Sequence, residues 1–208
     1  MRIEFVEIAN FRKLLSTRVG LSVEKTVFVG ANNSGKTSAI TALRYFLIDR
    51  ERSSFCFNDI TLAHWPTINA LGDTWEAENV ANQPLSAPEW DSVLPFLYVW
   101  LQVAENEVHY VQKILPTLDW DGGRLGVRMR LEPKDSIELQ QEYVAARSQA
   151  LKLQAAGAAL AAEQGKAEAD FQVAIWPQSL VDFLQRRLAA FFVVKAYVLD
   201  PSGCVDPE

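Results

Sequence analysis

The chain is short of the residues on which several classes of protein depend. Its 208 residues include two cysteines, Cys56 and Cys204, which are far apart and indicate neither a disulfide framework nor a zinc site. The two histidines, His64 and His109, are equally isolated, which argues against a metal site. The longest apolar run, from Val93 to Leu101, has about half the length that a membrane span needs, and no signal-peptide segment opens the chain. We expect a cytoplasmic protein with no membrane partner.

Positive charge is missing from a long central stretch. No Lys or Arg occurs between Arg52 and Lys113, and residues 51–120 hold two Lys or Arg against ten Asp or Glu. Residues 1–50 hold eight against four. Because a nucleic-acid backbone is bound through cations, any DNA contact is expected on the N-terminal part, outside this chain, or on a basic strand face. The arginines of that face, for which simple solvation is the alternative, are Arg124, Arg128 and Arg130.

Hydrophobic periodicity indicates an α/β protein. Alternating or apolar segments predict strands at residues 2–8, 19–23, 26–29, 96–103, 124–131 and 191–199. Helical spacing predicts a helix at residues 36–48, directly after a glycine-containing loop. Between 55 and 95, the tryptophans predict short helices packed by aromatic side chains, and the prolines that interrupt them are Pro66, Pro84 and Pro88. This order favours a mixed sheet covered by helices.

Residues 135–170 differ in composition from the rest of the chain. They are rich in Ala, Gln and Glu, lack proline and carry few large apolar side chains. Leu139, Tyr143, Ala146, Ala150, Leu153 and Leu160 fall on one stripe of a helix at heptad-like spacing. We expect a helix of roughly 50 Å, as an arm that projects from the domain or as a helix that lies on its surface.

The loop at residues 30–37 reads GANNSGKT and fits the phosphate-binding pattern G-x-x-x-x-G-K-[ST] between an expected strand and an expected helix. Gly30 and Gly35 permit backbone angles that turn successive N–H groups inward, where the helix N-terminus also favours an anion. Lys36 can reach the β- and γ-phosphates, and the Thr37 hydroxyl can bind Mg²⁺. The sequence therefore predicts ATP and Mg²⁺ as ligands. A plain glycine turn before a helix is the alternative.

The stretch IANFRKL at 8–14, followed by GANNSGKTSAITAL from residue 30, resembles the opening of ABC-class ATPases of DNA maintenance. These are RecF, SMC-like proteins and, above all, the OLD (overcoming lysogenization defect) family. The resemblance is specific over residues 1–50, looser over 90–135, and architectural beyond. It implies a P-loop NTPase of ABC/SMC type with 1–134 as the first part of the ATPase head, 135–170 as a helical arm that could dimerise, and 171–208 as the return to the head.

The resemblance also implies site residues. The nucleotide would be bound by Gly30, Asn32, Asn33, Ser34, Gly35, Lys36, Thr37 and Ser38. Arg12 matches a position near the nucleotide in this class, with a solvated turn arginine as the alternative. Gln102 or Glu105 falls where the class places its Q-loop, which helps to hold Mg²⁺ and the attacking water; we favour Gln102.

Two elements that an ABC-class ATPase needs are not found in the sequence. No Leu-Ser-Gly-Gly-like signature occurs, and the one apolar strand that ends in an acid, at 196–200, has Pro201 where a Walker B glutamate should follow Asp200. We expect a chain that is truncated before these elements and not active alone.

The function that the resemblance implies is that of the ATP-binding domain of an OLD-like ATP-dependent DNA endonuclease. Such a protein would act in anti-phage defence, as a homodimer or higher homo-oligomer, on DNA. The alternatives are a RecF- or SMC-like DNA repair ATPase without nuclease activity, and a non-catalytic dimerisation module that uses residues 135–170.

Overall fold

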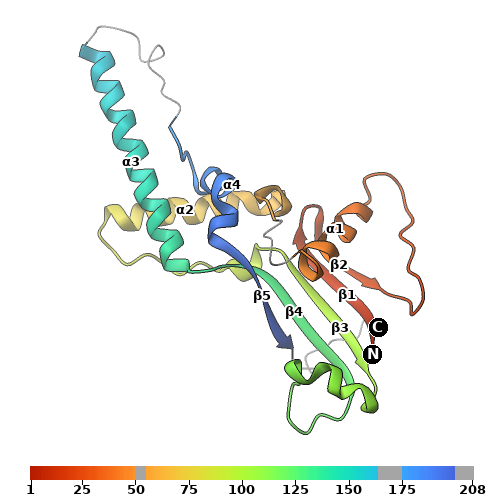
Figure 1. Ribbon diagram of the computed structural model, residues 1–208. Helices are drawn as coiled ribbons and strands as arrows, with labels where there is room; N and C mark the ends of the chain where they lie inside the picture. The colour runs from red at the N-terminus through yellow and green to blue at the C-terminus, as the bar shows by residue number, and fades with distance from the viewer. Residues whose placement is uncertain (50–54, 164–174, 200–208) are drawn as a thin grey trace. The chain divides into compact units, whose positions relative to one another are not determined.

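The computed structural model describes residues 1–49, 55–163 and 175–199, which form two compact units (Figure 1). The first contains the described parts of Met1–Leu62, Leu94–Glu132 and Phe192–Glu208 and carries the β-sheet. The second contains the described parts of Ala63–Val93 and Pro133–Phe191 and is mainly helical. Residues 63–93 thus join the arm region in one unit. Within the described ranges, no helix is both long and apolar enough to cross a bilayer.

Five strands build the sheet of the first unit, in the spatial order β2-β1-β3-β4-β5. They are β1 (Arg2–Phe11), β2 (Leu14–Gly20), β3 (Phe96–Val103), β4 (Gly123–Pro133) and β5 (Phe192–Leu199). β1 pairs antiparallel with both β2 and β3, and β3 pairs antiparallel with β4. The strands expected at 2–8, 96–103, 124–131 and 191–199 are confirmed with small shifts at their ends. The strand expected at 19–23 is misplaced, because β2 ends at Gly20 and residues 21–23 are not in a strand.

The basic face of β4 is paired with carboxylates. The guanidinium of Arg124 forms an ion pair with Glu4 at 3.0 Å, and that of Arg130 forms one with Glu132 at 3.4 Å. Arg128 lies on the same strand with its guanidinium carbon 5.4 Å from the centre of a tyrosine ring. Ion pairs of this kind reduce the positive potential that a phosphate backbone requires. They favour a neutralised strand face over a nucleic-acid contact.

Helix α1 (Lys36–Leu47) covers the sheet beside β1 and β3 and confirms the helix expected at 36–48. Its buried residues include Ala42 and Phe46. The Phe46 ring meets that of Phe55 at 4.9 Å between centroids, and Phe11, the last residue of β1, meets Phe55 edge-on at 6.1 Å. Such aromatic contacts add to the stabilisation from burial. They fix α1, and with it the preceding loop, beside the end of β1.

The strand expected at Thr26–Val29 is wrong. The structure assigns no strand to these residues, and Val27 and Val29 expose 64% and 87% of their surface. A short apolar strand of this type is stable only when neighbouring strands satisfy its backbone on both sides, and no strand of the described residues pairs with it.

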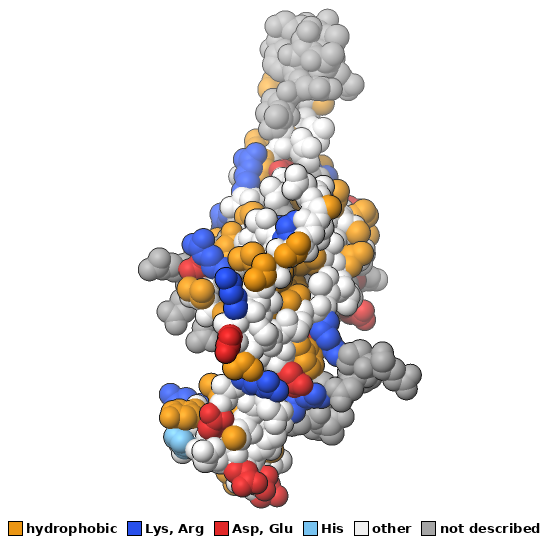
Figure 2. Space-filling view, turned by 90° about the vertical axis from the view of Figure 1, so that its right-hand side faces the viewer, with side chains coloured by type: hydrophobic (Ala, Val, Ile, Leu, Met, Phe, Trp, Pro, Cys, Tyr) orange, Lys and Arg blue, Asp and Glu red, His pale blue; other side chains and the backbone are white. Residues whose placement is uncertain are grey.

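Figure 2, which views the molecule from the side of Figure 1 on which α1 lies, shows hydrophobic side chains at the surface next to Lys and Arg.

Three helices pack against one another in the second unit, namely α2 (Trp65–Val80), α3 (Ser136–Glu163) and α4 (Leu180–Phe191). The prediction of short, interrupted helices at 55–95 is wrong for residues 65–80, which form the continuous 16-residue helix α2. Pro66 lies in its first turn, where the missing N–H has no intrahelical partner to lose, so it begins the helix instead of breaking it. Trp75 is fully buried against the ring of Tyr143 from α3, at 6.2 Å between centroids. Short 3₁₀ turns complete the two units at Phe57–Asp59, Leu62–His64, Trp90–Ser92 and Glu105–Ile114.

Helix α3 confirms the long helix expected in the arm region and combines the two arrangements left open for it. Its N-terminal part, as far as Ala150, buries Leu139 and Ala150, while Leu153 and Leu160 further along are exposed. Figure 1 shows α3 continuing past the neighbouring α2 and α4. Its 28 residues span about 42 Å. Residues 164–170 of the expected helix lie outside the described residues, as do Asp200 and Pro201.

Candidate nucleotide-binding site

The glycine loop ends at the N-terminus of α1 and contains residues with left-handed backbone angles. Gly35 is the N-cap residue, with φ 92° and ψ 0°, and Asn33 has φ 67°. No side chain caps the first turn of the helix. Left-handed residues that alternate with ordinary ones make an anion-binding concavity of N–H groups, and the helix N-terminus adds its partial positive charge. The loop therefore has the local geometry of a phosphate cradle.

Lys36 lies across this loop. Its ammonium donates hydrogen bonds to the carbonyl oxygens of Gly30 and Ala31 at 2.7 and 2.6 Å, and to the Ser34 hydroxyl at 3.3 Å. These bonds are exposed to water, so they contribute little to stability and can be exchanged readily. An ammonium in this position can exchange such bonds for the oxygens of a phosphate that enters the loop.

A pocket of about 310 Å³ opens beside the loop. Its lining residues are Arg12, Lys13, Asn33, Ser34, Gly35, Lys36, Thr37 and Ser38. Three of these described residues are cations and none is an acid, which suits a polyanion such as a nucleoside polyphosphate. Lys13 donates a hydrogen bond to the side-chain carbonyl of Asn33 and so links the turn after β1 to the loop.

The site chemistry fits Mg²⁺ only together with phosphate. Thr37 offers a hydroxyl one residue into α1, but the described residues include no cluster of three potential His, Cys, Asp or Glu ligands. Mg²⁺ is commonly held by one or two protein groups plus water and substrate phosphates. The residues present therefore suit a cation that arrives with a nucleotide.

Most of the predicted site residues lie together. Residues 33–38 and Arg12 share the pocket, and Gly30 and Asn32 belong to the loop without lining it. Gln102 is not brought to this site. It pairs with Arg2 at the start of β1, whereas Arg12 follows the other end of that strand, roughly 30 Å away at the rise of an extended chain.

Sequence reasoning missed one residue that lines the pocket and one that bonds to a lining residue. Lys13 follows Arg12 directly and lines the pocket, so the quoted stretch NFRK contained its signal. Asp59 is buried and its carboxylate accepts a hydrogen bond from the Arg12 Nε at 2.8 Å. An acid between the apolar residues Phe57 and Ile60 was the only hint of that second residue.

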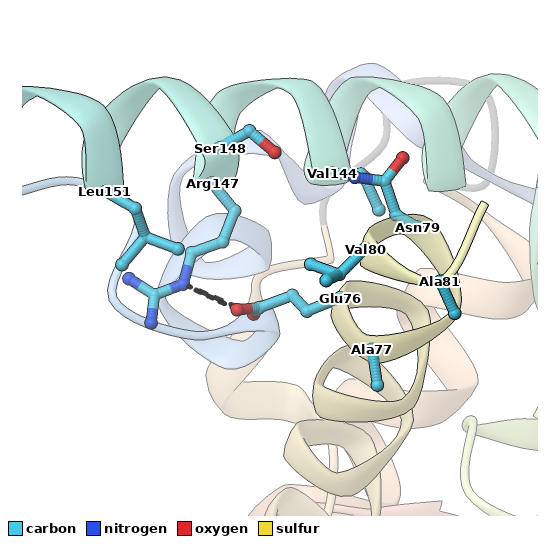
Figure 3. Close-up of a pocket in the computed structure, with 9 residues that line it drawn as sticks. All are labelled: Glu76, Ala77, Asn79, Val80, Ala81, Val144, Arg147, Ser148 and Leu151. Carbon is cyan, nitrogen blue, oxygen red and sulfur yellow. Dashed lines mark hydrogen bonds and ion pairs between the residues drawn. The ribbon is translucent and has the colours of Figure 1, made fainter.

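A second cavity, of about 400 Å³, lies between α2 and α3 in the helical unit (Figure 3). Its walls are mostly apolar, and Arg147 reaches from α3 to the Glu76 carboxylate on α2 at 3.1 Å. Glu76 also accepts a hydrogen bond from the Tyr143 hydroxyl at 2.5 Å. Burial, and then this hydrogen bond, raise the pKa of that phenol. The charged groups of this cavity thus satisfy each other, and we assign the pair a structural role.

A glycine loop at a helix N-terminus, ringed by cations, is typical of domains that bind nucleotide phosphates. Comparison with known families agrees. The sequence model that describes the AAA ATPase domain family matches residues 1–109, which is more than half of the chain. The chain therefore belongs to this family.

Comparison with curated proteins found no match. Among solved structures, one described as "Structural biochemistry of ATP-driven dimerization and DNA stimulated activation of SMC ATPases" is similar over 90% of this chain and 96% of that chain. The sequence identity is 16% and the TM-score 0.34, a level that does not establish a shared fold.

Proposed function

We propose that this chain is the ATP-binding part of an ABC-class, SMC-like ATPase, and that Mg-ATP binds at residues 30–38. Membership of the AAA ATPase domain family supports a nucleotide ligand. The observation that carries the proposal is the loop itself, with left-handed Asn33 and Gly35, an uncapped helix N-terminus and three surrounding cations.

Each part of the loop would have a separate task. The backbone N–H groups would donate to the phosphates, and the Lys36 ammonium would exchange its bonds to Gly30 and Ala31 for β- and γ-phosphate oxygens. Thr37 would give its hydroxyl to Mg²⁺, with phosphate and water as further ligands. Arg12 and Lys13 would add charge from the turn after β1. When bound, Mg²⁺ supplies charge neutralisation between the phosphates.

The wider role that we propose is ATP-controlled DNA cleavage by an OLD-like endonuclease in anti-phage defence. The support is the resemblance of NFRK and GANNSGKT to that family. A RecF- or SMC-like ATPase that acts on DNA without cutting it is the alternative. Incubating the natural protein with ATP, Mg²⁺ and DNA distinguishes them, because cleavage supports the first and ATP-dependent binding without cleavage supports the second.

A homodimer is also part of the proposal. The second half of α3 exposes Leu151, Leu153 and Leu160, and the only charged residue between 148 and 160 is Lys152. Exposed apolar side chains on a helix with so little charge favour contact with another protein surface. The third alternative, a non-catalytic dimerisation module, would retain this contact and lack nucleotide binding.

The experiment that tests nucleotide binding is calorimetric titration of Mg-ATP into the wild type and Lys36→Ala. A hydrogen bond from a charged group is worth about 1.5–3 kcal/mol, so we expect the affinity to fall roughly tenfold to a hundredfold. The melting temperature should not change, because the Lys36 bonds are exposed. Lys25→Ala, an exposed lysine outside the pocket, is the matched control. Equal affinity in all three proteins would refute the loop assignment.

A further inference from the structure

The carboxylate of Asp59 is buried, and both of its oxygens accept hydrogen bonds. It is 1% exposed, and Oδ1 accepts the hydrogen bond from the Arg12 Nε at 2.8 Å. Oδ2 accepts one from the Cys56 backbone N–H at 2.9 Å and one from its thiol at 3.3 Å. Burial, and then the neighbouring Asp59, raise the pKa of that thiol, which keeps it a donor. A buried carboxylate is strongly unfavourable unless it is paired, so these contacts hold Asp59 in one orientation.

The backbone around Asp59 also holds the turn that carries Arg12. The Arg12 N–H donates to the Asp59 carbonyl at 2.7 Å, and the Thr61 N–H donates to the Asn10 carbonyl at 3.1 Å. Asn10 and Arg12 have φ values of 55° and 52°, which residues other than glycine seldom adopt. Surrounding contacts must hold such a conformation in place. The segment 56–61 provides them from both ends of the turn.

This arrangement orients the arginine side chain. A guanidinium has five N–H donors in a planar fork, and the bond to Asp59 uses the one on Nε. The side chain is 34% exposed and Arg12 lines the pocket beside the loop. With the Nε edge fixed, the two terminal nitrogens are the part of the fork that can meet a bound anion bidentately.

We infer that Asp59 is a positioning residue for the nucleotide site, which orients Arg12 so that its terminal nitrogens bind the phosphates of ATP. The inference rests on the proposed nucleotide binding. It assigns a task to a residue that does not itself line the pocket and that lies 47 positions along the chain from its partner.

A double-mutant cycle tests this inference, with the Mg-ATP affinity of the 208-residue chain measured by calorimetry. Arg12→Ala should weaken binding roughly tenfold or more, because a charge-assisted bond is lost. Asp59→Asn keeps the shape of the side chain but loses its charge and one acceptor oxygen, so binding should weaken by a smaller factor than in Arg12→Ala. The double variant should match Arg12→Ala, because Asp59 acts only through the arginine.

Two results would overturn the inference. Additive losses in the double variant would mean that Asp59 affects binding through general structure. Tighter binding by Asp59→Asn would mean that the carboxylate mainly repels the phosphates. Glu7→Gln is the control. Glu7 forms a more exposed ion pair with Arg18, with 2.7 Å between the two charged groups, and neither residue lines the pocket. This variant should bind ATP as the wild type does.

A further variant keeps the inference testable if Asp59→Asn does not fold. Arg12→Lys retains the charge, but one ammonium cannot replace a fork that bonds Asp59 and a phosphate together. We expect it to bind as weakly as Arg12→Ala, and wild-type affinity would overturn the inference. If Lys36→Ala loses ATP while the cycle is additive, the proposed function survives and this inference alone fails. If the wild type does not bind ATP, both fail.

Discussion

Replacing Gly35 by alanine should destabilise the protein and weaken its nucleotide site at the same time. Gly35 has φ 92°, and an added Cβ would come within 2.9 Å of the Leu14 Cδ2. A left-handed conformation costs a residue with a Cβ about 1–2 kcal/mol. The Leu14 contact adds little, because the end of a flexible side chain can move aside. We therefore expect a loss of about 1–2 kcal/mol in the free energy of unfolding.

Gly20→Ala is the matched control for this change. Gly20 lies in the same unit at the end of β2, has no atom within 4 Å of an added Cβ, and does not have a left-handed φ. It should be neutral or slightly stabilising, because alanine reduces the entropy of the unfolded chain. Thermal melts followed by circular dichroism should give Gly35→Ala a melting temperature about 2–8 °C below that of Gly20→Ala. Equal melting temperatures would refute the argument from the backbone of the loop.

Three other predictions concern the sheet, the arm and catalysis. Gly126→Ala should lower the free energy of unfolding in urea by about 1–3 kcal/mol, since its Cβ would lie 2.7 Å from the Trp100 ring and 2.9 Å from the Leu199 Cβ; unchanged stability would contradict this packing. Leu153→Glu with Leu160→Glu should shift a homodimer to monomer in light scattering, and an unchanged mass would remove α3 from the interface. The chain alone should release no phosphate from ATP above background, because no acid lines the pocket to polarise water; steady release that Lys36→Ala abolishes would show otherwise.

The glycine loop and the helix that follows it were predictable because their information is local. Eight consecutive residues carry the pattern, and the helix that follows provides the N-terminus on which it depends. The placement of Arg12 near the nucleotide came only from the family resemblance and stays a prediction, although Arg12 and the loop line the same pocket. Asp59 was not predictable, because its contact with Arg12 depends on how residues 56–61 pack against the end of β1.

The errors share a physical cause, which is that periodicity does not identify partners. Residues 26–29 are apolar enough for a buried strand, but their neighbours decide whether one forms, and the described sheet offers none. Gln102 was chosen by its place at the end of a strand. The antiparallel pairing of β3 with β1 puts that end beside Arg2 and far from the loop. Pro66 reads as a helix breaker in the sequence, although in the first helical turn it is favourable.

Hydrogen–deuterium exchange with and without Mg-ATP tests the central claim most directly, because the proposed ligands are backbone N–H groups, which side-chain truncation leaves in place and whose exchange can be measured one segment at a time. We expect ATP to slow exchange at residues 30–38, with a smaller effect around Arg12 and Asp59 and none on the exposed half of α3. Mg²⁺ without nucleotide should leave the loop unchanged, since the site suits the cation only together with phosphate. Unchanged exchange at residues 30–38 under saturating Mg-ATP, or protection confined to another part of the chain, would contradict the account.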